Sequence, residues 1–334
     1  MQNLKLLNIN RLTDLISKRP GEVKLGEKIR VLKSSHNIYE QIRDLDVKYV
    51  IFGIKEDIGV RANLGISGTK VTWKKFLLSF LNIQHNAFIK ANKILVLGHL
   101  SFKAYYKNID SLDIKDLRNI TSEIDKSVSF LSQAIIKAKK IPIIIGGGHN
   151  NAYGIIKGCA LALNKKINVL NIDAHTDFRP LEGRHSGNGF SYAFHEGFVK
   201  NYFAYGLHEN YISEYFLEQL IANKNHIKYI SYEALLGVKG QQNKEDLYNQ
   251  IRKFICQRKF GLELDCDAIK NIRSSAQSPV GFETSTIRRL IHDYSANKNV
   301  LYFHICEGMA SNSPENRIGK LITYLITDFI KANQ

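Results

Sequence analysis

The segment INVLNIDAHTD at residues 167–177 joins an apolar run to three residues of metal-binding type. The uncharged run 167–172 is typical of a strand buried on both faces of a parallel sheet. Side chains two residues apart on an extended backbone share a face, so we expect Asp173, His175 and Asp177 to converge without a special turn. The segment therefore predicts an α/β fold with a metal site at a strand end.

Two other segments repeat this arrangement. The strand-like run IPIII at 141–145 leads into GGGH at 146–149, and FGLEL at 260–264 leads into Asp265 and Asp267. Glycines let the backbone turn sharply at a strand end, where ligands gather in open α/β sheets. The three strand ends together offer two histidines and four aspartates: His149, Asp173, His175, Asp177, Asp265 and Asp267.

The chemistry of these residues indicates a pair of divalent cations. Oxygen ligands with a minority of imidazole favour Mn²⁺ or a similar ion over a thiolate zinc site, although affinity order alone leaves Fe, Co, Ni and Zn open. Four carboxylates roughly balance two dipositive ions, which would lower the pKa of a water held between them. The alternative, solvated loop carboxylates with a core histidine, requires three independent coincidences.

The motifs GGGH, DAHTD, SGN and ELDCD, followed by a late glutamate at Glu307, resemble in order and spacing the ureohydrolase family of arginases, agmatinases and formimidoylglutamases. The resemblance runs from about Val47 to about Gly308. It implies a hydrolase of C–N bonds in guanidines or amidines with two Mn²⁺ ions per chain. It also implies two ligand sets that share Asp173 and Asp265 as bridges: His149, Asp173, Asp177 and Asp265 for the first ion, and Asp173, His175, Asp265 and Asp267 for the second.

Several positions resemble the formimidoylglutamases rather than the arginases. Arg179 stands second after DAHTD, GGGH replaces the arginases' GGDH, and Phe190 replaces a histidine that arginases have two residues beyond the asparagine of SGN. In one segment, GVRANLGI at 59–66, the similarity ends at Ile66, where formimidoylglutamases often have arginine. The resemblance implies that four residues contact the substrate: Arg179, Arg184, Ser186 and Asn188. The alternative for the two arginines is that they pair with nearby surface carboxylates.

Two acidic residues are expected to take part in the reaction. The resemblance implies that Glu307 pairs with the planar cation of the substrate, for which a carboxylate is suited. Asp177 would pass a proton to the leaving amine. We expect cleavage of N-formimidoyl-L-glutamate to glutamate and formamide. The alternatives are an arginase- or agmatinase-like guanidine hydrolase, or a metal-binding family member that has lost turnover.

One departure lies next to the expected ligands. Glu263 stands where family members usually have serine or threonine, and the third acid and the proline of the usual DxDxxDP are absent after Asp267. Glu263 shares the ligand face and is expected to accept a hydrogen bond from a metal-bound imidazole. The loop 273–276 is expected to cover the cleft.

The pattern of apolar runs predicts a three-layer α/β/α sandwich with a largely parallel central sheet in a single domain over residues 1–334, and the family resemblance implies that this sandwich is arginase-like. Residues 1–46 form a less regular N-terminal extension, with a helix expected from Leu4 to Ser17. Further helices are expected at 73–81 and 122–139. Strands are expected at 47–54, 94–97, 141–145, 167–172, 203–207, 228–231, 260–264 and 300–305.

Composition narrows the class of protein further. The 334 residues are 44% hydrophobic and carry a formal charge of +16, but the lysines are spread along the chain without an arginine-rich block or nucleic-acid-binding motif, so we expect no nucleic-acid partner. The four cysteines lie in apolar stretches without CxxC spacing, which favours buried thiols in a reducing, cytoplasmic location. No signal peptide or membrane-spanning run is evident. The family resemblance implies a homo-oligomer.

Overall fold

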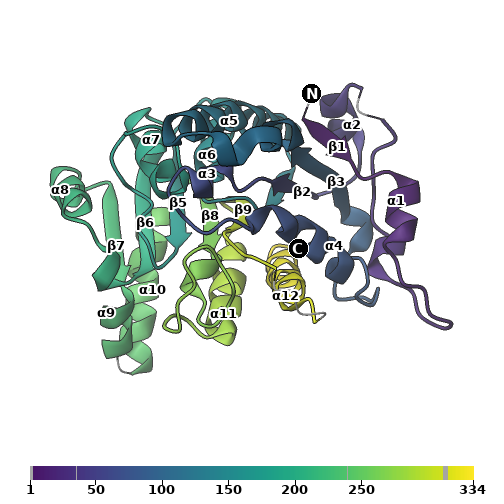
Figure 1. Cartoon of the computed structure of the whole chain (residues 1–334). Helices are drawn as coiled ribbons and strands as arrows, with labels where there is room; N and C mark the ends of the chain where they lie inside the picture. Colours follow the sequence, from purple (N-terminus) through teal and green to yellow (C-terminus); the bar gives the residue numbers. More distant parts are fainter. Residues whose placement is uncertain (1–2, 35, 239, 311–314) are drawn as a thin grey trace.

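The protein is built around one mixed sheet in a computed structural model that describes residues 3–34, 36–238, 240–310 and 315–334 (Figure 1). Among these residues, nine strands lie in the order β1-β3-β2-β4-β9-β8-β5-β6-β7. β1 pairs antiparallel with β3, and every other neighbouring pair is parallel. The strands are β1 (Leu4–Leu6), β2 (Tyr49–Lys55), β3 (Ile94–Ser101), β4 (Ile141–Ile145), β5 (Ile167–Ile172), β6 (Val199–Leu207), β7 (Ile227–Ser231), β8 (Phe260–Asp265) and β9 (Val300–Cys306).

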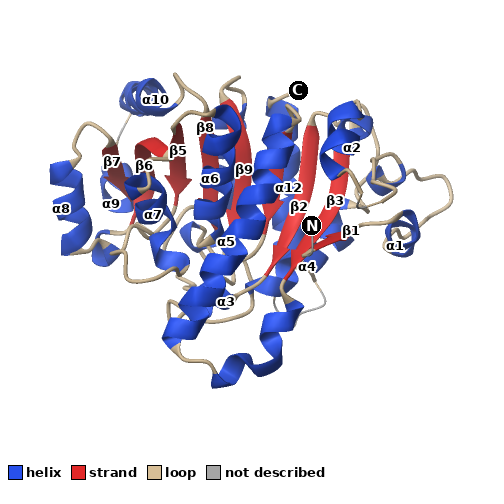
Figure 2. Ribbon diagram, turned by 90° about the horizontal axis from the view of Figure 1, so that it is seen from above, coloured by secondary structure: helices blue, strands red, loops and turns tan. Residues whose placement is uncertain are grey.

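Helices cover both faces of this sheet, which confirms the three-layer α/β/α sandwich. α2, α3, α5, α6, α7 and α8 pack on one face, and α1, α4, α9, α10, α11 and α12 on the other. Figure 2 shows α5 and α6 lying over the central strands. The helices are α1 (Ile9–Asp14), α2 (Ile38–Asp44), α3 (Ile58–Arg61), α4 (Thr72–Phe80), α5 (Ile114–Lys137), α6 (Asn151–Leu163), α7 (Gly189–His195), α8 (Glu214–Ala222), α9 (Tyr232–Gly237), α10 (Gln241–Ile255), α11 (Thr284–Ser295) and α12 (Arg317–Ala332). Among the described residues, no helix combines the length and apolar character needed to cross a bilayer.

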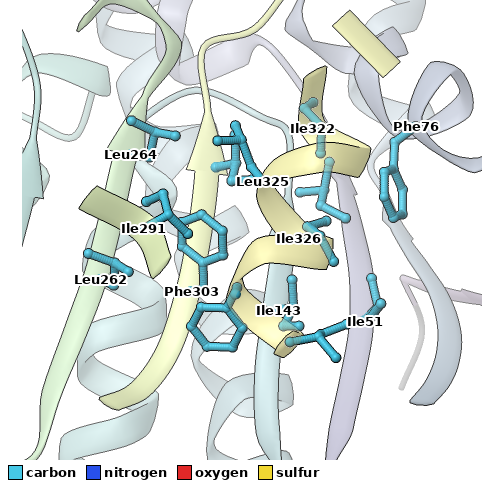
Figure 3. Close-up of a cluster of buried hydrophobic side chains, with 14 of the residues drawn as sticks. Ile51, Phe76, Ile143, Leu262, Leu264, Ile291, Phe303, Ile322, Leu325 and Ile326 are labelled. Carbon is cyan, nitrogen blue, oxygen red and sulfur yellow. The ribbon is translucent and has the colours of Figure 1, made fainter. Parts of the chain in front are cut away.

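The core divides between the two faces because strand side chains alternate. Ile143 joins the cluster under α11 and α12, whereas Ile144 joins the cluster under α5 and α6. Figure 3 shows the first cluster, in which Phe303 of β9 lies beside Leu325 and Ile326 of α12. Each fully buried aliphatic side chain contributes about 1.5–3 kcal/mol. The central strands are therefore held from both sides and give the site a rigid base.

The predicted strands are confirmed, and β4 and β5 begin and end where predicted. The predicted N-terminal helix is wrong at its start. Leu4–Leu6 instead pairs with β3 as an edge strand, and α1 begins only after Asn8, whose side chain accepts a hydrogen bond from Arg11 N. The apolar spacing of this short segment suits either a helix or a strand, and pairing with the free edge of β3 makes it a strand.

Candidate metal centre

Four adjacent strands bring the predicted ligands together. β4, β9, β8 and β5 are neighbours in the middle of the sheet and run parallel, so their carboxyl ends meet at one edge. GGGH follows β4, Glu307 follows β9, Asp265 and Asp267 lie at the end of β8, and DAHTD follows β5. Four segments that are distant in sequence therefore meet at one edge of the sheet.

The backbone reaches this arrangement through turns. The chain bends at Ala174 and His175, and Asp177 adopts a left-handed φ of 43°. After Asp265 the chain enters a 3₁₀ turn at Cys266–Ala268. The prediction that the ligands converge on an extended backbone is therefore wrong, although the residues themselves do converge. The turns are stabilised locally, because the side chains of Asp173 and Asp265 accept hydrogen bonds from the backbone N–H two residues on, at 2.8 and 2.7 Å.

The first group of ligand atoms surrounds His149. Its Nδ1 lies 3.2 Å from Asp173 Oδ2, 2.8 Å from Asp177 Oδ2 and 3.1 Å from Asp265 Oδ2. One atom from each of the four side chains lies within 4.8 Å of the others, which suits a single cation. Buried His149 Nδ1 has no hydrogen-bond partner, as expected of a nitrogen reserved for a metal.

The second group adjoins the first through Asp173. His175 Nδ1 lies 3.6 Å from Asp173 Oδ1 and 3.6 Å from Asp267 Oδ2. Asp173 thus directs one oxygen toward each imidazole, the arrangement required of a bridging carboxylate. The His175 ring stacks on Tyr211 with centroids 4.9 Å apart. Sequence reasoning missed Tyr211, which lies in the 3₁₀ turn Glu209–Tyr211 after β6.

The electrostatics of the cluster also favour cations. Burial and the neighbouring carboxylates of Asp267 and Asp173 raise the pKa of Asp265 well above its usual range. Burial and Asp173 likewise raise the pKa of Asp177. Burial alone would lower the pKa of His175, but Asp173 and Asp267 raise it to about 10. Crowded carboxylates repel one another when ionised, and divalent cations relieve that repulsion, so these residues fit a metal pair.

A buried glutamate that sequence reasoning missed holds the GGGH loop in place. Glu56 Oε1 accepts hydrogen bonds from Gly148 N at 3.0 Å and from Asn151 Nδ2 at 2.5 Å, while Oε2 accepts one from Ile58 N at 2.7 Å. Gly146 has a φ of 84°, a conformation that favours glycine. The position of Glu56 just after the β2 strand, at the same edge as GGGH, was the available signal.

Glu307 lies beside the ligands and offers a free oxygen. Its Oε1 accepts a hydrogen bond from His149 N at 2.6 Å, and its buried Oε2 has no hydrogen-bond partner. Burial and Asp267 raise the pKa of Glu307 to about 8. Its φ is 57°, so the two residues with predicted roles in the reaction, Glu307 and Asp177, both adopt left-handed backbone. Strain of this kind is often found at functional sites.

A cleft of about 360 Å³ opens onto the ligands. Of the predicted substrate contacts, Arg179 and Ser186 line it, and so do Ser275 and Ala276 of the loop expected to cover it. Arg179 is half exposed, donates to Asn63 Oδ1 at 2.6 Å and pairs with Glu182 at 2.8 Å. It therefore satisfies both alternatives, a carboxylate pair and a place in the cleft. The lining residues that sequence reasoning missed include Asn63, Tyr211, Ser213 and Tyr215.

Two predicted substrate contacts are placed elsewhere. Arg184 is buried outside the cleft, where it pairs with Asp125 at 2.9 Å and lies over the ring of Tyr153. Asn188 is also buried: its side-chain oxygen accepts from Arg184 and its nitrogen donates to the Gly183 carbonyl at 2.7 Å. Neither side chain lines the cleft: the Arg184 guanidinium is committed to Asp125, Asn150 and Asn188, and the Asn188 amide to Arg184 and the Gly183 carbonyl.

Phe190 and the four cysteines all lie in the protein interior. Phe190 is buried and packs edge-on against His149, with ring centroids 5.0 Å apart. All four cysteines are free and buried, as predicted. Cys266 belongs to the apolar cluster on the sheet face that α11 and α12 cover. Its side chain therefore points away from the proposed ligands Asp265 and Asp267.

A model of the arginase family matches residues 81–330, most of the chain. The chain belongs to the arginase family. Within it, formimidoylglutamase of Geobacillus sp. (strain WCH70) is 26% identical over 293 residues, covering 82% of this chain and 83% of the relative. Formimidoylglutamase of Lysinibacillus sphaericus is 26% identical over 233 residues, covering 68% of this chain and 71% of the relative.

Solved structures share the arginase-family fold. The formimidoylglutamase from Bacillus subtilis gives a TM-score of 0.74 at 15% identity, covering 95% of this chain and 93% of that one. Trypanosoma cruzi formiminoglutamase with Mn²⁺ gives a TM-score of 0.71 at 17% identity, covering 93% of this chain and 98% of that one. At these identities the likeness shows the fold alone.

Proposed function

We propose that this arginase-family chain hydrolyses N-formimidoyl-L-glutamate to L-glutamate and formamide with two Mn²⁺ ions. The observation that carries the proposal is the placement of Asp173 between two imidazoles, with Arg179 and Glu307 on the wall of the same cleft. Curated relatives along most of the chain are formimidoylglutamases, and the T. cruzi protein carries Mn²⁺.

The six residues would hold two ions as two ligand sets that share two carboxylates. Asp173 and Asp265 would be the shared residues. Each has a carboxylate oxygen in the His149 group, and each stands two residues before a member of the second group, His175 or Asp267. His149 and Asp177 complete the first set, and His175 and Asp267 the second. When bound, two such cations supply a nucleophile at neutral pH and stabilise negative charge developing at the reacting carbon.

The chain's own residues bind the substrate and move a proton. Water adds to the amidine carbon, the bond from that carbon to the glutamate nitrogen breaks, and formamide and an amine result. Glu307 Oε2, buried and unpartnered, orients the cationic amidinium. Asp177, on the cleft wall, carries the proton to the departing glutamate nitrogen.

Arg179 accounts for the preference for an acidic substrate. Its guanidinium is held at the cleft by Asn63, so it can pair with a carboxylate of formimidoylglutamate in competition with Glu182. A paired contact of this kind contributes about 1.5–3 kcal/mol. It also disfavours a cationic tail such as that of agmatine.

The test compares three substrates, and it compares a variant at Arg179 with a control variant at Arg118. Protein loaded with Mn²⁺ should release formamide from formimidoylglutamate, with arginine and agmatine poor or inert. Arg179→Gln should lower kcat/KM about 10- to 100-fold while both ions stay bound. Arg118→Gln is the matched control, because Arg118 also pairs with Glu182, at 3.6 Å, but lies outside the cleft lining.

Faster release of urea from arginine than of formamide would instead assign a guanidine hydrolase. Full metal loading without turnover of any substrate would identify a metal-binding member of the family. Unchanged kinetics in Arg179→Gln would remove Arg179 from substrate recognition.

A further inference from the structure

A ladder of buried polar side chains lies on the sheet behind His149. The strand register places Asn171 of β5 beside Glu263 of β8, and Glu263 beside His304 of β9. All three are fully buried, on the sheet face covered by α5, α6 and α7. Buried polar groups of this kind are costly unless they are paired with one another.

Glu263 is the centre of this ladder. Its Oε1 accepts a hydrogen bond from Tyr302 Oη at 2.6 Å, and its Oε2 lies 2.6 Å from His304 Nδ1. Gly261 makes room for the tyrosine ring, since a Cβ at that position would lie 2.2 Å from Tyr302 Cζ. These contacts fix the carboxylate between β8 and β9 in one orientation.

The same carboxylate faces the rear of a metal ligand. Glu263 Oε2 lies 3.5 Å from His149 Nε2, which has no hydrogen-bond partner of its own. The opposite ring nitrogen, Nδ1, faces Asp173 and Asp265. A carboxylate behind Nε2 favours the tautomer with its proton there, which leaves the lone pair of Nδ1 free for a cation.

We propose that Glu263, held by Tyr302 and His304, is a positioning residue that fixes the ring orientation and tautomer of His149 and thereby strengthens the first metal site selectively. The inference rests on the proposed metal pair. It goes beyond that proposal because it assigns a role in metal binding to a residue that is not itself a proposed ligand.

The selectivity follows from the different surroundings of the two imidazoles. His149 is fully buried and backed by Glu263, whereas the side chain of His175 is 26% exposed and rests against Tyr211. A change at Glu263 therefore reaches the first ion through His149 but leaves His175 and its surroundings as they are.

The test measures metal binding rather than turnover. In Glu263→Gln, the side chain loses its negative charge and keeps one acceptor oxygen instead of two, so it holds the Nε2–H of His149 less strongly and the affinity of the first site for Mn²⁺ should fall about 10- to 100-fold. The second site should change less than about threefold. Calorimetric titration of the variant with Mn²⁺ should therefore resolve two separate binding steps, one for each ion. The exchange-coupled electron paramagnetic resonance signal of paired Mn²⁺ should need higher Mn²⁺ to develop, and excess Mn²⁺ should restore it.

Tyr302→Phe is the matched control, because it removes one donor to Glu263 but leaves the carboxylate behind His149. Its two affinities should stay within about threefold of those of the wild type. A second measurement needs no variant: ¹⁵N spectra of histidine-labelled wild-type protein loaded with Zn²⁺, assigned with His149→Gln, should show His149 protonated at Nε2.

Three results would overturn the inference: unchanged affinities in Glu263→Gln, equal loss at both sites, or a His149 protonated at Nδ1 in the labelled protein. Because none of these readouts uses a substrate, failure to cleave formimidoylglutamate would count against the proposed function and leave this inference standing. Binding of only one ion by the wild type would instead remove the metal pair on which both rest.

Discussion

At the scale of single residues, the site depends on how each carboxylate divides its two oxygens. Asp173 offers one oxygen to the His149 group and the other to His175. Asp265 directs Oδ2 at His149, while its Oδ1 accepts from Asp267 N. We therefore propose that these two aspartates are shared by both halves of the cluster, whereas each histidine serves one.

This difference predicts how alanine variants lose metal. Asp265→Ala should lose both ions, because it removes a shared ligand, whereas His149→Ala should mainly weaken one. Metal analysis after gel filtration measures the ions retained per chain, with the exposed Asp110→Ala as a control that keeps both. A full two-ion complement in Asp265→Ala would contradict the bridging assignment.

At the scale of elements, α6, the helix that follows GGGH, approaches the backbone of α5 closely. α6 packs against α5, and Gly158 of α6 is so near that a Cβ there would lie 2.3 Å from the carbonyl oxygen of Ser129 and 2.9 Å from Gln133 N. Both contacts are with backbone atoms, which cannot rotate away. Glycine at this position is thus required by helix packing, and through α6 it supports the loop that carries His149.

Gly158→Ala should therefore destabilise the protein by about 1–3 kcal/mol, as overpacking does, although alanine is the better helix former by about 1 kcal/mol. Gly237→Ala is the matched control, because Gly237 is also helical but has nothing within 4 Å of the added Cβ. Urea unfolding of metal-loaded protein should show the control unchanged or slightly stabilised. Equal midpoints for the two variants would refute the packing argument.

At the scale of the whole molecule, the excess of positive charge makes stability depend on pH. The chain carries a formal charge of +16, and His99 on β3 is buried close to Lys55, Arg11 and Lys5. Burial and these cations lower the pKa of His99 from 6.5 to about 4. Between those values the unfolded chain binds a proton that the folded chain does not, so stability falls as pH falls through this window.

His99→Gln should remove this contribution. Between pH 7 and pH 5, the wild type should lose about 1–2 kcal/mol more than the variant, after allowance for solvent screening. Urea unfolding at both pH values measures the difference, and contributions from the metal cluster cancel because both proteins share it. The same loss in the two proteins would show that His99 does not titrate in this window.

The sequence by itself determined the layered fold, the central strands and the six metal-ligand candidates. It could do so because these features are local: INVLNI and IPIII carry no charged residue, and the ligand candidates follow them within a few residues. Parallel pairing then required the strand ends to meet at one edge. The alternation of side chains along the strand also singled out Glu263, which shares a face with Asp265, and the family resemblance singled out Glu307.

Only the tertiary structure decided which partners these residues have. The turn at Ala174 and the left-handed Asp177 replaced the extended backbone expected there. Arg184 pairs with Asp125, and the GGGH loop is held by Glu56, both contacts with residues far away in sequence. The physical reason is that a buried charged side chain pairs with whichever opposite charge or hydrogen-bond donor the packing of distant helices and strands brings within reach, and no local pattern encodes that partner.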